Sequence, residues 1–258
     1  MEKMKLMRAL WRCYPRRYAE PGDYIGLQIG QLKAEIRRII VALDFDETIL
    51  EAARDFRPDL ILTHHPFIYG TPKAVLSADE KKAELARILV AELETAVVSL
   101  HTNFDAAPGG MNDLLADCLD LINVYRCPAF PMMRIGKLEN AMEIEVFIDY
   151  FMHKTGIGYA GLVNAGSQTI RKIAFIAGGG SGYFRLAQAE GADIFVSGDC
   201  PHHVRRDIIR YGMNYLDVPH EIERLFVPAL EKTLLSIDPQ LEVLPIDHEK
   251  ETKIYSAR

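Results

Sequence analysis

The chain has 258 residues, which is enough for one large or two small domains with a sizeable core. Hydrophobic residues make up 49% of it and charged residues 26%, as in ordinary globular proteins, so the composition excludes a disordered or fibrous chain. The formal net charge of -6 argues against nucleic acid as the main partner, although a local basic patch could still bind it.

Four scattered cysteines, with no C-x-x-C pair among them, predict no disulfide framework and favour a reducing compartment. The first twenty residues mix charged and apolar side chains, so they lack the apolar core of a signal peptide. No stretch reaches the ~20 apolar residues that a membrane helix needs. We therefore expect a cytoplasmic protein with no membrane partner.

Strands and helices alternate through the first half of the chain. Branched apolar runs predict strands at 37–45 and 59–66, and a third strand together with its following loop at 96–105. Helical spacing predicts helices at 46–56, 77–94 and 112–121. Ser77, with Glu80 three residues later, forms a candidate capping box. This alternation predicts an α/β fold with a mostly parallel central sheet.

The second half repeats this pattern without a gap. Residues 38–63 align with residues 172–197, so the offset is 134 at both ends, and Asp59 falls on Asp193. A predicted helix and strand at 206–220 continue the second copy. Two unrelated strand–helix units would also resemble each other, but the ungapped register favours duplication.

The repeat divides the chain into three segments that form one compact body. We expect a first α/β repeat at 1–124, a connector at 125–170 and a second α/β repeat at 171–258. The connector starts with a proline-containing, loop-like stretch. It then shows helical spacing up to Gly156, a candidate C-cap. We expect no third domain in it.

Two adjacent histidines, His64 and His65, end the predicted strand at 59–66. Neighbouring side chains on a strand point to opposite faces, so both can reach one metal only if the backbone distorts. At a strand end followed by proline, each ring could instead serve a different ion of a close pair, or one ring could bind while the other packs. The carboxyl end of a parallel strand is where α/β sheets place their sites.

Similar groups follow two other predicted strands. His101 and Asp105 follow one of them, and His220, Glu221 and Glu223 follow the last. Imidazole together with carboxylate suits Zn, Mn, Fe or Ni, and the absence of a nearby thiolate argues against a structural cysteine site. A single histidine at a strand end is more often a hydrogen-bonding core residue, but three such motifs together favour a divalent metal site.

Two further segments are candidates for substrate binding. The glycine-rich stretch at 178–183 could cradle a phosphate on backbone amides around Gly180, or could form only a tight turn. His202 and His203 could contact a substrate, or could belong to a polar loop. His248 lies in a surface-like context and is assigned no role.

Taken together, these motifs resemble those of a known family. The chain contains, in order, GLQIG (26–30), LILTHHPFIYG (60–70), HTNFDAAPGGMNDLLA (101–116), AGGGSG (177–182), GADIFVSGD (191–199) and LDVPHEIER (216–224). This order is similar to that of the NIF-three-like family, whose bacterial members are often named GTP cyclohydrolase 1 type 2 homologs. The resemblance spans roughly residues 20 to 235.

The resemblance implies two intertwined, similar α/β repeats that assemble into a ring-like homohexamer, a trimer of dimers. It implies a dinuclear site with two divalent ions per chain. The ligands would be His64, His65, Asp105, His220 and a glutamate after it. His101, in the same loop as Asp105, is the candidate catalytic residue for proton transfer, or supports a ligand.

The chain departs from the family pattern at the glutamate. Family members carry a glycine before the third histidine and a glutamate four residues after it, but Pro219 and Arg224 stand at these positions. Glu223 follows His220 by three residues, and positions three and four residues apart share one helix face. We therefore expect Glu223 to be the ligand, with Glu221 as the weaker candidate.

Three functions are consistent with these residues. The first is a dinuclear metal-dependent hydrolase that opens the imidazole ring of GTP by metal-activated water, as the family name implies. The second is a phosphoesterase or other hydrolase of nucleotide derivatives that uses the same ligands. The third is a non-catalytic metal-binding interaction protein, which closed metal shells would favour.

Overall fold

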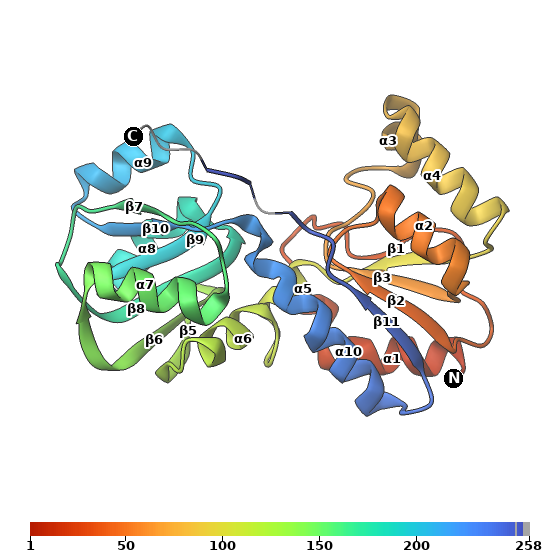
Figure 1. The fold of residues 1–258 in the computed structure, drawn as a ribbon, viewed down its shortest axis with the longest axis horizontal. Coiled ribbons are helices and arrows are strands. Elements are labelled where there is room, and N and C mark those ends of the chain that lie inside the picture. Colours follow the sequence, from red (N-terminus) through yellow and green to blue (C-terminus); the bar gives the residue numbers. More distant parts are fainter. Residues whose placement is uncertain (251, 255–258) are drawn as a thin grey trace. The chain divides into compact units, whose positions relative to one another are not determined.

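The chain folds into two compact units in the computed structural model, which describes residues 1–250 and 252–254 (Figure 1). Unit 1 comprises Met1–Pro108 and Arg224–Glu249, and unit 2 comprises Gly109–Glu223 and Lys250–Arg258. The chain therefore leaves unit 1, forms unit 2, and returns to unit 1 through α10 (Phe226–Ile237) and β11 (Glu242–Ile246). Among the described residues, no helix is long and apolar enough to cross a membrane.

Unit 1 is built on a five-stranded sheet in the order β1-β4-β3-β2-β11. Its other strands are β1 (Gly26–Ile29), β2 (Arg38–Ala42), β3 (Leu60–Thr63) and β4 (Ala96–Ser99). β1 is antiparallel to β4, and all other neighbours are parallel. The carboxyl ends of β2, β3, β4 and β11 therefore meet at one edge of the sheet.

Helices cover both faces of this sheet. They are α1 (Lys3–Cys13), α2 (Glu47–Phe56), α3 (Pro72–Ala78), α4 (Glu80–Ala91), the short α5 (Thr102–Ala106) and α10, with the 3-10 turn η1 (Arg16–Tyr18). On one face Ile40 and Ile61 pack in a cluster with Ile49 of α2 and Leu89 of α4. The alternate strand residues are equally buried, because α1 and α10 lie on the opposite face (Figure 1).

Unit 2 holds a six-stranded sheet in the order β5-β6-β8-β9-β10-β7. Its strands are β5 (Ile122–Cys127), β6 (Phe130–Glu143), β7 (Gly161–Val163), β8 (Thr169–Gly179), β9 (Ile194–Gly198) and β10 (Asn214–Asp217). Only β8, β9 and β10 run parallel to one another. The carboxyl ends of these three strands form the edge that carries the polar residues described below.

The helices of unit 2 are short. They are α6 (Met111–Cys118), α7 (Ile144–Thr155), α8 (Phe184–Ala189) and α9 (His202–Arg210), with the 3-10 turns η2 (Ser181–Tyr183) and η3 (His220–Leu225). α6 and α7 pack against β6 and β8, whereas α8 packs against β9 and α9 against β10 and β7. Both faces of the parallel strands are therefore covered.

The internal repeat is confirmed at the level of strand register. The equivalent pairs are Ile39 with Leu60 in unit 1 and Ile173 with Ile194 in unit 2. Asp59 accepts backbone hydrogen bonds of 2.9 and 3.0 Å from Arg37 and Arg38. Asp193 accepts bonds of 2.9 and 2.7 Å from Arg171 and Lys172. In each copy, an aspartate just before the second strand of the repeat accepts hydrogen bonds from two consecutive backbone amides of the first strand or of the residue before it. These bonds hold the two neighbouring strands together.

The α/β class is confirmed, but the strands form two sheets instead of one central sheet, and the second is mixed, with two parallel and three antiparallel pairings. The stretch at 125–170, expected to be a connector, supplies β6, α7, β7 and half of β5 in unit 2. Pro131 suggested a loop, yet it lies near the start of β6, where a strand tolerates proline. The unit boundaries therefore differ from those predicted at 124 and 170.

Two capping predictions had different outcomes. Gly156 is the C-cap of α7 with a φ of 70°, as expected. The helix at 77–94 is instead two helices, and Ser77 lies inside α3. Asp79 separates them and caps α4, because its side chain accepts a 3.0 Å hydrogen bond from the amide of Lys82.

Candidate metal centre

Three histidines meet at the carboxyl edge of the unit 1 sheet. His64 and His65 follow β3, and His101 follows β4, its neighbour in the sheet. One ring nitrogen from each of the three lies within 4.8 Å of the other two, close enough to bind a common ion. The structure therefore brings together the two motifs that the sequence singled out in the first half of the chain.

The backbone turn after β3 explains how two consecutive histidines reach the same place. The amides of His64 and His65 donate to the single carbonyl of Leu43, at 3.1 and 3.0 Å. The carbonyl of His65 accepts from the hydroxyls of Thr63 and Ser99, at 2.9 and 3.0 Å. The chain is thus no longer extended at this point, and the two ring centroids lie 5.0 Å apart.

Each of these rings is held through its Nδ1 atom. The contacts are His64 with the carbonyl of Leu100 at 2.8 Å, His65 with Asp44 at 2.7 Å, and His101 with Asp23 at 2.9 Å. Carbonyl and carboxylate oxygens only accept, so Nδ1 carries the proton and Nε2 presents its lone pair. Metal-binding histidines in proteins are oriented in the same way.

Asp105 adds a carboxylate to this cluster from α5. Its Oδ1 lies 3.4 Å from Nε2 of His64, and both side chains are buried. With the His64 proton on Nδ1, this contact places two electron-rich atoms next to each other. A divalent cation bound by both would make the arrangement favourable, and borderline ions accept this mixture of imidazole and carboxylate. The donor set of unit 1 therefore fits a metal ion.

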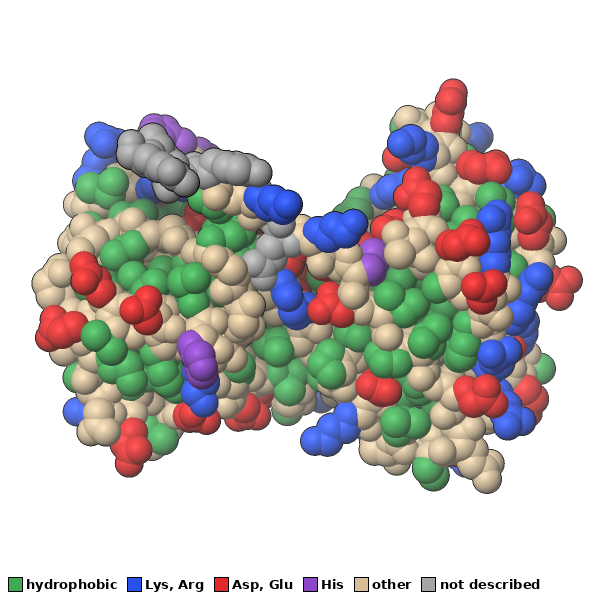
Figure 2. All heavy atoms as spheres, in the orientation of Figure 1, with side chains coloured by type: hydrophobic (Ala, Val, Ile, Leu, Met, Phe, Trp, Pro, Cys, Tyr) green, Lys and Arg blue, Asp and Glu red, His purple; other side chains and the backbone are tan. Residues whose placement is uncertain are grey.

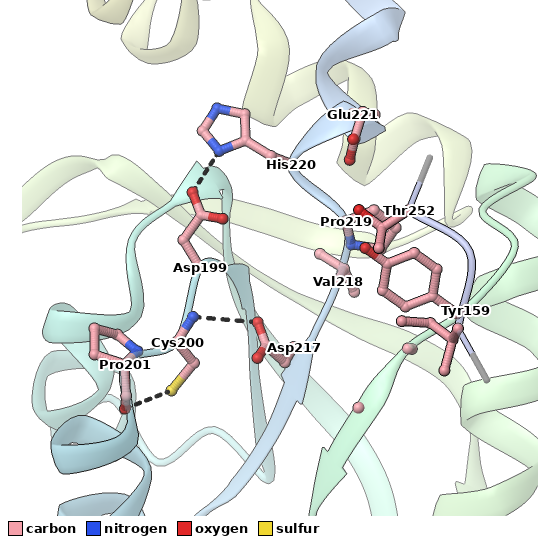
Figure 3. A pocket seen from close by; sticks show the side chains of 13 residues that line it. Tyr159, Asp199, Cys200, Pro201, Asp217, Val218, Pro219, His220, Glu221 and Thr252 are labelled. Carbon is pink, nitrogen blue, oxygen red and sulfur yellow. Dashed lines mark hydrogen bonds and ion pairs between the residues drawn. The ribbon is translucent and has the colours of Figure 1, made fainter. Parts of the chain in front are cut away.

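A second set of donors lies in unit 2. His220 begins η3, directly after β10, and its Nδ1 contacts Asp199 at 2.5 Å, as the dashed line in Figure 3 shows. Its Nε2 lies 3.1 Å from Oε2 of Glu223, which is buried. The hydrogen bond with Glu223, aided by Asp199, raises the pKa of His220 to about 9. His220 and Glu223 thus form the histidine–carboxylate pair that the sequence predicted.

Gly178 makes room for this carboxylate. It lies at the end of β8 with a φ of +66°, and a Cβ atom there would be 2.0 Å from Oε1 of Glu223 and 3.3 Å from Nε2 of His220. Only glycine offers both the backbone conformation and the space. The glycine-rich stretch therefore serves the approach of Glu223.

The predicted substrate residues are placed differently from the expectation. The amide of Gly180 donates to the hydroxyl of Ser197 at 2.7 Å, so it is already engaged and does not await a phosphate. His202 and His203 are exposed in the first turn of α9. Neither is among the described residues that line the cavity beside His220.

Three aspartates that hold the histidines were missed from the sequence. Asp44 and Asp199 follow β2 and β9 closely, so the strand-end rule that selected the histidines could have found them. Asp23 lies in the loop before β1 and also accepts from Thr102. No strand pattern points to it.

His248 is a correction to the sequence-based assignment. It was expected at the surface, but its side chain is only 12% exposed, and its Nε2 lies 3.1 Å from Asp46. β11 runs parallel to β2, with Ile246 opposite Ala42, so the residues after both strands reach the same edge. A fourth histidine therefore lies near the unit 1 ligands.

Comparison with known sequences identifies the family. A family model described as Duf34/NIF3 (NGG1p interacting factor 3) matches residues 1–252. A GTP cyclohydrolase 1 type 2 homolog of Clostridium perfringens is 29% identical over 238 residues, which cover 89% of this chain and 90% of that protein. A protein of the same name from Methanocaldococcus jannaschii is 29% identical over 238 residues, with coverages of 90% and 94%.

Solved structures agree with this relationship. A Staphylococcus aureus hypothetical protein is 25% identical, with a TM-score of 0.86 and coverages of 98% of this chain and 99% of that one. A Bacillus cereus protein related to NIF3 has a TM-score of 0.87 at 20% identity, with coverages of 100% and 99%, which shows a shared fold. The chain belongs to the Duf34/NIF3 family.

Proposed function

We propose that this chain is a metal-dependent hydrolase that binds about two divalent ions, Zn, Mn, Fe or Ni, as dinuclear hydrolases do. The observation that carries the proposal is the orientation of four histidines. His64, His65, His101 and His220 each have Nδ1 against a carbonyl or carboxylate oxygen. At His64 and His65 this orientation presents Nε2 as a ligand atom, and at His101 it presents Nε2 as a proton acceptor. At His220 a metal ion would displace the proton that Nε2 shares with Glu223.

Each unit offers its own donor set in this proposal. Unit 1 supplies His64, His65 and Asp105, and unit 2 supplies His220 and Glu223. A divalent ion held by either set would supply Lewis acidity, which would lower the pKa of a water molecule and polarise the group under attack. An imidazole–carboxylate donor set leaves room for such a water, unlike a closed four-cysteine site.

His101 is the proposed proton acceptor. Its Nδ1 donates to Asp23, so Nε2 can take a proton from water or substrate, and the carboxylate then stabilises the imidazolium. Burial would raise the pKa of Asp23, but hydrogen bonds from His101 and Thr102 outweigh it and lower the pKa to about 2. Asp23 therefore remains ionised in this role at every pH near neutrality.

Covalent catalysis by a thiol is disfavoured near His220. Burial, together with the charge of Asp217, raises the pKa of Cys200. A protonated thiol is a poor nucleophile. Metal-assisted attack by water is consequently the chemistry that this arrangement supports best.

The candidate reaction is opening of the imidazole ring of GTP at C8, with release of formate. Its support is the name carried by several relatives, GTP cyclohydrolase 1 type 2 homolog. Hydrolysis of a phosphoester or another nucleotide derivative would use the same ligands and is the rival reaction. We also propose further copies of the chain as its partners, in a homohexamer.

The face of unit 1 drawn in Figure 2 has mixed charges. On the face of unit 1 drawn in Figure 2, Lys and Arg side chains alternate with Asp and Glu side chains. Nucleic-acid binding needs a continuous basic stripe or patch. With a net charge of -6, a small molecule is the better candidate substrate.

The test is formate release from GTP by protein purified without chelator, with phosphate release from nucleotides and model phosphoesters measured in parallel. Metal-dependent turnover that falls at least ~100-fold in His101→Ala, the typical scale of a general base, is expected. His153→Ala removes an exposed histidine of α7 and is the matched control. If metal-loaded protein released neither formate nor phosphate, the proposal of a hydrolase would be contradicted. The remaining alternative would be a non-catalytic metal-binding protein.

A further inference from the structure

A cavity of about 590 Å³ lies in unit 2 beside His220 (Figure 3). Its size is within the range of small-molecule sites in proteins. Val218 and Pro219, which precede His220, form part of its apolar wall, and the ring of Tyr159 lines it as well. Apolar walls and an aromatic ring suit a planar heterocycle, which can stack on the ring.

Carboxylates are prominent among the polar side chains of this cavity, which also include His220, Cys200 and Thr252. Asp199, Asp217 and Glu221 line it, and no lysine or arginine is among the described lining residues. A phosphate placed among these carboxylates would be repelled. Hydrogen-bond donors such as ring N–H and amino groups would be attracted, because an ionised carboxylate only accepts.

Asp217 is the carboxylate best placed to recognise a ring. Its side chain is 24% exposed, and its two present contacts, with the amide of Cys200 and with Arg205, are both long at 3.3 Å. A carboxylate has about four lone-pair sites, so these contacts leave capacity for a ligand. Burial raises the pKa of Asp217 despite both contacts, so further hydrogen-bond donors would stabilise its charge.

We propose that this cavity binds the heterocyclic ring of the substrate, and that Asp217 selects rings with two adjacent N–H donors. The ring N–H and amino group of a 2-amino-4-oxopyrimidine, the edge that guanine presents, match the two carboxylate oxygens. The sugar and any phosphates then lie outside the acidic lining. This inference rests on the proposed function, because His220 lines the same cavity and is a proposed metal ligand.

Calorimetric titration with guanosine and inosine tests the proposal, because the two nucleosides differ only in the 2-amino group. Metal-containing protein as purified should bind guanosine about tenfold more tightly, the effect of one hydrogen bond to a charged group. Asp217→Asn should remove this preference and leave the metal content unchanged. Asp207→Asn makes the same chemical change on the exposed side of α9 and should keep the preference.

Three results would overturn the inference: equal affinities for both nucleosides, no detectable binding of either, or a preference that persists in Asp217→Asn. Nucleoside binding is measured without turnover, so its outcome is separate from that of the formate assay. A guanosine preference without turnover would overturn the hydrolase and retain the ring site. Turnover without a guanosine preference would retain the hydrolase and overturn the ring site.

Discussion

Replacement of Gly178 by alanine perturbs one ligand position with little other change. The new Cβ atom would lie 2.0 Å from Oε1 of Glu223, whereas real Cβ contacts essentially never fall below 3.0 Å. The carboxylate must therefore retreat by about 1 Å, and a displacement of this size can cost on the order of 100-fold in activity. The positive φ adds a strain of about 1–2 kcal/mol for an L-residue.

Gly178→Ala should consequently lose metal on dialysis and unfold at a temperature lower by roughly 2–8 °C, as expected for that strain in a chain of this size. Elemental analysis and thermal unfolding measure the two effects. Gly182→Ala is the matched control, because Gly182 lies only four residues further on, in η2, has no positive φ and has nothing within 4 Å of its Cβ position. If Gly178→Ala kept its metal as well as Gly182→Ala does, the assignment of Glu223 as a ligand would be refuted.

Three further substitutions test other parts of the account. His64→Ala should lose bound metal while its circular dichroism stays native, and full metal retention would remove His64 from the ligand set. Asp199→Asn should weaken metal binding about 10- to 100-fold, because the residue orients His220; an unchanged affinity in a competition titration with a chelator would show that this contact does not matter. The Asp23 pKa is lowered from 3.8 to about 2, so its stabilisation is present above pH 3.8 and is lost as the pH falls towards 2. Asp23→Asn should therefore lower the free energy of unfolding by up to about 2 kcal/mol at neutral pH but not near pH 2, and a pH-independent difference in urea denaturation would contradict the His101 contact.

The sequence was most informative where a motif lies at the end of a strand. HHP and HTNFD were predicted to lie at the carboxyl ends of parallel strands, and the structure places His64 and His101 there. The repeat offset of 134 also recurs in the strand register, since Ile39 pairs with Leu60 and Ile173 with Ile194. These features depend on local chain geometry, which spacing along the sequence records.

Features that depend on the tertiary arrangement were missed. Asp44 follows a predicted strand, so its position could have been noticed, but its contact with His65 depends on β2 lying next to β3, and no local pattern gives the order of strands in a sheet. β11 contains Pro245, which argues against a central strand, but β11 is the edge of its sheet and tolerates it. The return of the chain to unit 1, and with it the burial of His248, therefore had no signal in the sequence.

The most direct test of the central claim is the metal content of the protein purified without chelator or added metal. The account predicts about two divalent ions per chain, and loss of both metal and hydrolytic activity on chelation, with recovery of both on reconstitution. Protein that stays metal-free after reconstitution, with native circular dichroism, would contradict the account. The oriented histidines would then have to be explained by packing alone.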